Sequence, residues 1–255
     1  AGEVEKVKGL LDEKVDVNGE DKKTWNTPLL TAIGTGEKDM VELLLEKGAD
    51  VSRRAGEGGL GRTPLQVAML ASKGSIAELL LDKGADVNEP LARSSQSQFS
   101  LLVALIVWSY QSHNAPPYKL VQLLLAHGIK VNYSDACWSG SPLDAAVYSR
   151  DLKMMKLLLD AKADPNASSH LHHSPAQAIA EAVEWADQEE ALRVLAGAGG
   201  KVTAVEAAAL TNAATLEKVL KDRPAAIKDA DPTGRTPLHM AAYGAREECM
   251  RVLIS

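Results

Sequence analysis

Three histidines within one short stretch come closest in this sequence to residues that could do chemistry. They are His170, His172 and His173. Neutral imidazole nitrogens bind zinc, but a zinc site also needs fixed geometry and supporting hydrogen bonds. These three lie nearly adjacent on a predicted loop, with no cysteine or carboxylate at a helical spacing. We therefore expect neither a metal site nor a cofactor.

The two cysteines, Cys137 and Cys249, also give no sign of a reactive centre. They form no CxxC pair, and no basic residue close to Cys137 in the sequence would lower the pKa of its thiol.

Other motifs of enzymes are missing from the sequence as well. No phosphate-binding, dinucleotide-binding or nucleophile-elbow motif occurs. We predict that the chain is not an enzyme. Low cysteine usage favours a reducing cytoplasm, and a periplasmic or secreted protein stays open as an alternative.

Composition excludes several other classes of protein. The chain has 255 residues, of which 45% are hydrophobic and only 4% aromatic, so aliphatic and small side chains must fill its core. Such side chains suit closely packed helices. The 28 basic and 34 acidic residues give a net charge of −6 without a basic cluster, which argues against nucleic-acid binding. The longest apolar stretch, residues 101–108, is too short to cross a bilayer.

An internal repeat defines the elements that must position any functional residue. Thr-Pro-Leu occurs at 27–29, 63–65 and 236–238, Ser-Pro-Leu at 141–143 and Ser-Pro-Ala at 174–176. A second phrase follows, as VELLLEKGAD at 41–50, AELLLDKGAD at 77–86, VQLLLAHG at 121–128 and MKLLLDAKAD at 155–164. One residue of each repeat, at the position of this proline, marks the repeat register, and we call it the register anchor. Successive register anchors are 36, 36, 42, 33, 29 and 33 residues apart. They are Pro28, Pro64, Ser100, Pro142, Pro175, Ala204 and Pro237.

Each residue type in this repeat has a local physical reason. Serine or threonine caps the first N–H groups of a helix, and proline follows where its missing N–H is not needed. The leucine triplet predicts a second helix, which ends at a glycine suited to the left-handed conformation, as at Gly48, Gly84 and Gly128. Lys162 replaces this glycine in one unit, and we expect a penalty of about 1 kcal/mol there.

The phrase at residues 236–241, Thr-Pro-Leu-His-Met-Ala, matches T-P-L-H-x-A of the ankyrin repeat without a mismatch. The sequence therefore resembles the ankyrin-repeat family over nearly its whole length. The resemblance implies an all-α solenoid of stacked helix-turn-helix units joined by short β-hairpin fingers. In such a solenoid each unit packs only against its neighbours.

The repeat register predicts two sub-arrays. Residues 1–200 would hold a partial first repeat and five further repeats, and residues 201–255 a second sub-array or a continuation of the same solenoid. The reasons are a missing finger near residue 200 and a longer helix exit at 221–231. Because neither end of the chain resembles a polar capping unit, we expect part of a longer protein. A cleaved signal peptide is the alternative.

The resemblance implies that partners bind at the finger tips and on the concave face formed by the first helices. Exposed aromatic side chains at such places are typical interface anchors. Each indole at a finger tip either contacts a partner or folds back on its own finger. The long turn at 108–118 is either a second binding surface or a neutral insertion. The candidate contact residues are Trp25, Tyr133, Trp138 and His172 at tips and Tyr148 and Tyr243 on first helices.

We therefore predict a non-catalytic module for protein–protein interaction. It would be monomeric or part of a larger complex, without nucleic-acid binding or membrane insertion. The alternative is a regulatory or targeting segment of a larger enzyme, channel or toxin-type protein whose activity lies outside these residues.

Overall fold

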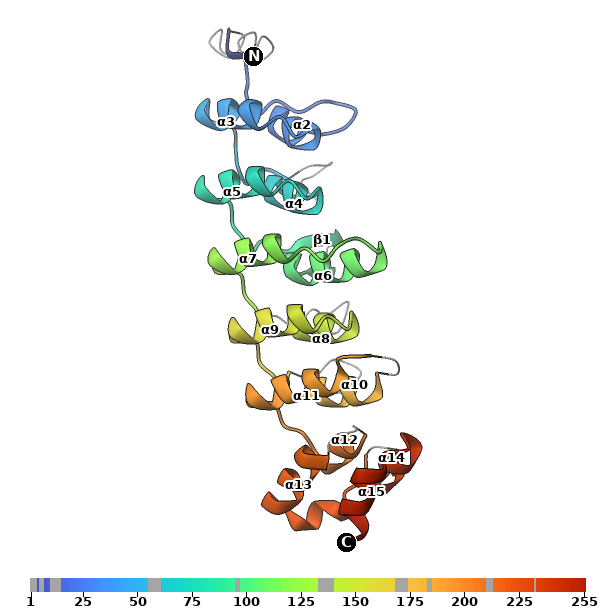
Figure 1. Ribbon diagram of the computed structural model, residues 1–255. Coiled ribbons are helices and arrows are strands. Elements are labelled where there is room, and N and C mark those ends of the chain that lie inside the picture. Colours follow the sequence, from blue (N-terminus) through green and yellow to red (C-terminus); the bar gives the residue numbers. More distant parts are fainter. Residues whose placement is uncertain are drawn as a thin grey trace. The chain divides into compact units, whose positions relative to one another are not determined.

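The computed structural model is a succession of helix pairs (Figure 1). It describes residues 4, 7–9, 15–54, 61–94, 97–132, 140–167, 174–182, 185–209, 213–231 and 233–255. The chain divides into two compact units, Ala1–Trp138 and Ser139–Ser255. No helix in the described ranges is long and apolar enough to cross a membrane.

Three described helix pairs build the first unit. They are α2 (Pro28–Thr35) with α3 (Lys38–Glu46), α4 (Pro64–Leu70) with α5 (Gly74–Asp82), and α6 (Leu101–Gln111) with α7 (Tyr118–Ala126). First helices pack on first helices, α2 on α4 and α4 on α6, while α3, α5 and α7 pack in the same order. The finger before α6 is an antiparallel hairpin of β1 (Leu91–Ser94) and β2 (Ser97–Phe99), with Leu91 opposite Phe99.

The second unit contains four helix pairs among its described residues. These are α8 (Pro142–Tyr148) with α9 (Leu152–Asp160), α10 (Pro175–Glu181) with α11 (Gln188–Gly197), α12 (Ala204–Ala208) with α13 (Ala213–Asp222), and α14 (Pro237–Tyr243) with α15 (Glu247–Ile254). A 3-10 helix, η2 (Pro224–Lys228), forms the predicted long exit after α13. The predicted all-α solenoid class is confirmed. The sub-array boundary near residue 200 lies inside this unit and stays a prediction.

Helix starts follow the capping chemistry that the sequence indicates. Thr63 Oγ1 accepts a hydrogen bond from the Gln66 N–H at 3.3 Å, and Gln66 Oε1 accepts one from the Thr63 N–H at 3.0 Å, which makes a reciprocal capping box.

The predicted position of the third register anchor, at Ser100, was wrong by one residue. Ser100 is the N-cap of α6, so Leu101 occupies the proline position, because serine fits the cap and leucine tolerates the first helical turn.

The second helix of a repeat is followed by a residue in the left-handed backbone conformation. Gly48 and Gly84 have φ of 89° and Gly128 has φ of 78°. At the same place Lys162 has φ of 68°, as its substitution for glycine predicts. A side chain is disfavoured in this region because its Cβ crowds the backbone.

Replacing Lys162 by glycine should therefore stabilise the chain. Relief of about 1–2 kcal/mol of left-handed strain exceeds the added unfolded-state entropy of glycine, so we expect the free energy of unfolding to rise by roughly 0.5–1 kcal/mol. Urea unfolding followed by circular dichroism measures this change. Lys162→Ala is the control because it removes the long side chain but keeps Cβ, and equal stability of the two variants would contradict the prediction.

An asparagine in the segment after the second helix of one repeat, which we call the exit of that repeat, forms hydrogen bonds to the exit of a neighbouring repeat. Asn88 Nδ2 donates to the Gly128 carbonyl at 3.2 Å, and Asn88 Oδ1 accepts from the Lys130 N–H at 2.8 Å. We call this pair of bonds the asparagine clamp. The same clamp links Asn18 to Gly48 and Asp50, and Asn166 to Gly199 and Lys201.

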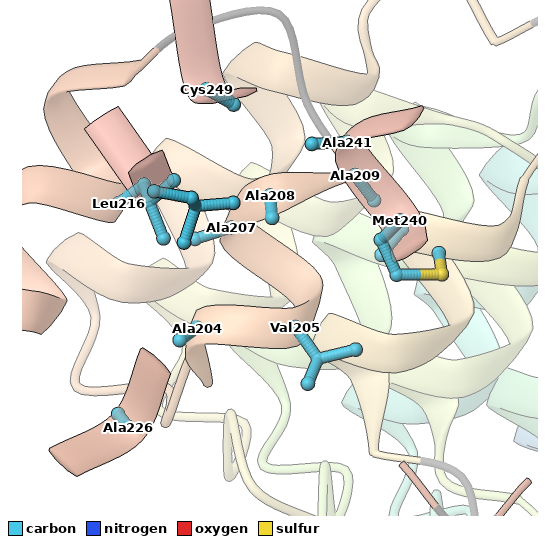
Figure 2. Packing of buried hydrophobic residues seen from close by; sticks show 12 residues of the cluster. Ala204, Val205, Ala207, Ala208, Ala209, Leu216, Ala226, Met240, Ala241 and Cys249 are labelled. Atoms are coloured by element: carbon cyan, nitrogen blue, oxygen red, sulfur yellow. The ribbon is translucent and has the colours of Figure 1, made fainter. Parts of the chain in front are cut away.

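Small side chains allow the helices of the second unit to approach closely. Ala204, Ala207, Ala208 and Ala241 are fully buried between α12, α13, α14 and α15 (Figure 2). Cys249 is buried in the same cluster, and burial raises the pKa of its thiol. This packing agrees with a core of small aliphatic side chains and makes Cys249 a core residue.

Candidate functional site

Three of the six predicted contact residues lie in the described part of the chain. Trp25 is 38% exposed in the first unit, and Tyr148 and Tyr243 are 63% and 85% exposed in the second. Tyr133, Trp138 and His172 lie outside the described residues, as do His170, His173 and Cys137.

Trp25 occupies a strained position in the finger before α2. Its φ of 56° is left-handed, and it lies two residues before the capping threonine, where the last described finger has Gly234 with φ of 83°. The finger is organised by Asp21, whose pKa is lowered by hydrogen bonds from the backbone of Thr24 and Lys23. A side chain is disfavoured in this conformation, as it is at Lys162, so Trp25 carries backbone strain that a glycine would avoid.

Tyr148 and Tyr243 occupy equivalent positions in their repeats. Each is the last residue of its first helix, seven positions after the N-cap. Glu181 holds this position in α10. In the first unit the same position is Gly34, Leu70 or Val107, and Val107 is only 3% exposed. Exposed tyrosine at this position is therefore particular to the second unit among the described residues.

The position three residues after the N-cap also differs between the units. In the first unit Leu30 and Val103 are buried there, with Gln66 as the polar exception. In the second unit every such residue is polar, and together with the residues at the seventh position they form what we call the first-helix face. Its members are Asp144, Tyr148, Gln177, Glu181, Glu206, His239 and Tyr243.

Two carboxylates of this face are held by helix caps. Burial raises the pKa of Asp144 and of Glu206, and the nearby Glu181 charge adds to the effect on Glu206. Glu206 Oε2 accepts from the Thr203 N–H at 2.6 Å, and its Oε1 accepts from Ser174 Oγ at 3.3 Å. Carboxyl groups with a raised pKa also occur as catalytic acids. Here the hydrogen bonds assign both groups to capping.

The raised pKa of Glu206 predicts how stability depends on pH. The folded state binds more protons than the unfolded state between the ordinary and the raised pKa, so stability falls as pH rises through that window. Glu206→Gln should remove this fall while keeping the cap, because Gln66 already caps α4 in the same way. We expect the variant to be more stable than the wild type above the window.

Urea unfolding at a series of pH values from about 4 to 8 measures this effect. Glu247→Gln is the control, because the Glu247 side chain is 78% exposed. The same slope of stability against pH in the wild type and in Glu206→Gln would refute the prediction.

An arginine connects the last finger to the first-helix face. Arg235 Nε donates to Asp231 Oδ2 at 2.7 Å, and a second guanidinium nitrogen lies 3.0 Å from Glu181 Oε1. Burial acts to raise the pKa of Asp231, but hydrogen bonds from Thr233 and Arg235 outweigh it and lower that pKa far below the ordinary value. Asp229 pairs with Arg223. These arginines are therefore already paired with carboxylates.

A cavity of about 280 Å³ opens on the first-helix face between α10, α12 and α14. The sequence did not indicate it, because its lining residues come from three different repeats. No group of three potential metal ligands occurs among the described residues.

The predicted second surface around Trp108 lies in the first unit. There the guanidinium carbon of Arg62 lies 5.4 Å from the centroid of the Trp108 ring. A role for the loop after Trp108 stays a prediction.

Comparison with known proteins agrees with this architecture. Family models match as ankyrin repeats (3 copies) at residues 1–90, ankyrin repeats (many copies) at residues 109–159 and an ankyrin repeat at residues 233–255. These matches together span more than half of the chain, which belongs to the ankyrin-repeat family. Ankyrin repeats generally act in protein–protein interaction and are typically non-catalytic.

Solved structures give the same fold. Among 484 matching chains is the crystal structure of an ankyrin repeat domain from Acinetobacter baumannii AYE. It has a TM-score of 0.60 and 20% sequence identity, over 89% of this chain and 96% of that chain. At this identity the similarity shows the fold alone. No curated protein matches the chain.

Proposed function

We propose that this chain is a non-catalytic module that binds a partner protein through the first-helix face of its second unit. Trp25 serves as a further contact on the first unit. Tyr133, Trp138 and His172 remain proposed contacts outside the described residues. The partner's surface would be recognised by aromatic and acidic side chains on rigidly stacked helices.

The exposure of Tyr148 and Tyr243 is the observation that carries this proposal. Both rings lie on helices whose starts are capped and whose other sides are buried. Rigid mounting lowers the entropy lost on binding, and tyrosine buries much area with few rotatable bonds. Truncating a central aromatic anchor generally weakens binding by about 2 kcal/mol or more.

The hydrogen bonds of the titratable groups on this face support a role without catalysis. Asp144 and Glu206 cap their own helices. His239 Nδ1 accepts a hydrogen bond from the Thr236 N–H at 3.2 Å, so this ring is engaged in a cap as well. Binding rather than proton transfer is therefore the use we assign to the face.

Affinity capture with paired variants tests the proposal. Wild type, Tyr148→Ala/Tyr243→Ala and Tyr110→Ala would be immobilised, and proteins captured from a lysate of the source organism quantified by mass spectrometry. Tyr110 is the matched control, because it is 45% exposed but lies in the first unit. Circular dichroism would confirm that the variants are folded.

We expect a partner that the wild type and Tyr110→Ala retain and that the double variant loses by at least about tenfold. Equal capture by all three proteins would reject the first-helix face as the binding surface. The loop after Trp108 and the Trp25 finger would then be the surfaces to test.

A further inference from the structure

The cavity on the first-helix face is large enough to hold a single side chain. Its volume of about 280 Å³ lies just below the range of roughly 300–1,000 Å³ that is usual for small-molecule sites. Part of its wall is aliphatic and comes from Ala180, Val205 and Met240. Figure 2 shows the side chains of Val205 and Met240 on α12 and α14, which pack against each other.

The lining also contains four acidic residues, Glu181, Glu206, Asp229 and Asp231, and one of them makes no ion pair within the described residues. Arg235 pairs with Asp231 and Glu181, and Arg223 pairs with Asp229. Glu206 makes no ion pair within the described residues, although it lines the cavity and is only 9% exposed. Its two oxygens accept hydrogen bonds from the Thr203 N–H and Ser174 Oγ, and a cation that approached them would favour the ionised form of the carboxyl group.

Together these features fit a partner side chain that has a long aliphatic stem and a cationic head. Lysine and arginine both place methylene groups against apolar surface and keep the charge at the polar end. Arginine fits better, because its planar guanidinium donates two parallel hydrogen bonds to a carboxylate and also stacks on aromatic rings. Tyr148 and Tyr243 lie outside the cavity lining, and their exposed rings on the first-helix face would serve neighbouring basic residues of the partner.

We propose that the partner presents a basic segment to the second unit and that one of its arginine side chains enters this cavity beside Glu206. The inference rests on the proposed function and adds the chemistry of the partner to it. A small anion is disfavoured, because Arg235, the arginine of the cavity lining, is already paired with Asp231 and Glu181. Among the described residues the cavity also offers no three-ligand set for a metal ion.

Selection from a phage-displayed library of random peptides tests this proposal with the full chain as bait. We expect arginine to be enriched at one position of the selected peptides, with further basic residues near it. A synthetic peptide of the selected sequence, measured by calorimetry, should bind Glu206→Gln at least about tenfold more weakly than the wild type.

Glu247→Gln is the charge-matched control for Glu206→Gln. Glu247 lies in the same unit on the second helix α15, outside the first-helix face and the cavity lining, and its side chain is exposed. Both variants change the net charge by the same amount. Binding should be unaffected by Glu247→Gln, and an equal loss in the two variants would show a general charge effect and overturn the proposal.

Other outcomes separate this inference from the proposed function. Peptides without basic residues that lose binding in Tyr148→Ala/Tyr243→Ala would overturn the arginine proposal and leave the binding face intact. Peptides whose binding is unaffected by the tyrosine and Glu206 variants would overturn both. Failure to select any peptide would also count against the arginine proposal, because a preformed cavity requires no rearrangement to accept a side chain.

Discussion

Replacing Leu143 by alanine is expected to lower the free energy of unfolding by about 3 kcal/mol, whereas Leu238→Ala should lower it by less than about 1 kcal/mol. Both leucines follow the capping residue and proline of their first helices. Leu143 is 0% exposed and Leu238 is 44% exposed. A buried leucine leaves a cavity when truncated, while a half-exposed one loses mainly its own partial contacts.

Urea unfolding of the wild type and the two variants, followed by far-ultraviolet circular dichroism, measures this difference. The comparison is matched, because the substitution, the helix position and the preceding Pro are the same. Equal losses of stability would mean that Leu238 is covered in solution. Such a result would contradict the exposure that distinguishes α14 from α8.

Loss of an asparagine clamp should have the second largest effect on the stability of the chain. Asn88→Ala removes two hydrogen bonds between successive repeats and leaves the Gly128 carbonyl and the Lys130 N–H to water. Because both bonds are solvent-exposed, we expect a loss of about 1–2 kcal/mol in the free energy of unfolding.

The reciprocal change tests the same physics with the opposite sign. Ser52 holds the clamp position in another exit, and its N–H donates to Asp50 Oδ1 at 2.8 Å, as the Asn88 N–H does to Asp86 Oδ1. Ser52→Asn should therefore place an amide near the Gly84 carbonyl and raise stability by up to about 1 kcal/mol. A loss of stability in this variant, or none in Asn88→Ala, would show that the clamp contributes nothing.

Local features of the fold could be predicted because they depend on residues adjacent in the sequence. The capping box of Thr63 with Gln66 lies within one helical turn, and the left-handed exit at Lys162 follows from its alignment with Gly48 and Gly84. The equivalence of Tyr148 and Tyr243 also follows from the repeat register alone. Where proline is absent the register loses its marker, which is why the anchor at Ser100 was wrong by one residue.

Contacts between repeats were decided only by the tertiary structure. The partners of Asn88 lie about 40 residues further along the chain, and the cavity lining at Glu181, Glu206 and Asp231 joins three helices. Repeat periodicity assigns Leu143 and Leu238 the same role, yet their burial differs. A repeating sequence specifies which surface each helix can offer, while burial, charge compensation and pKa depend on what the neighbouring helices place against it.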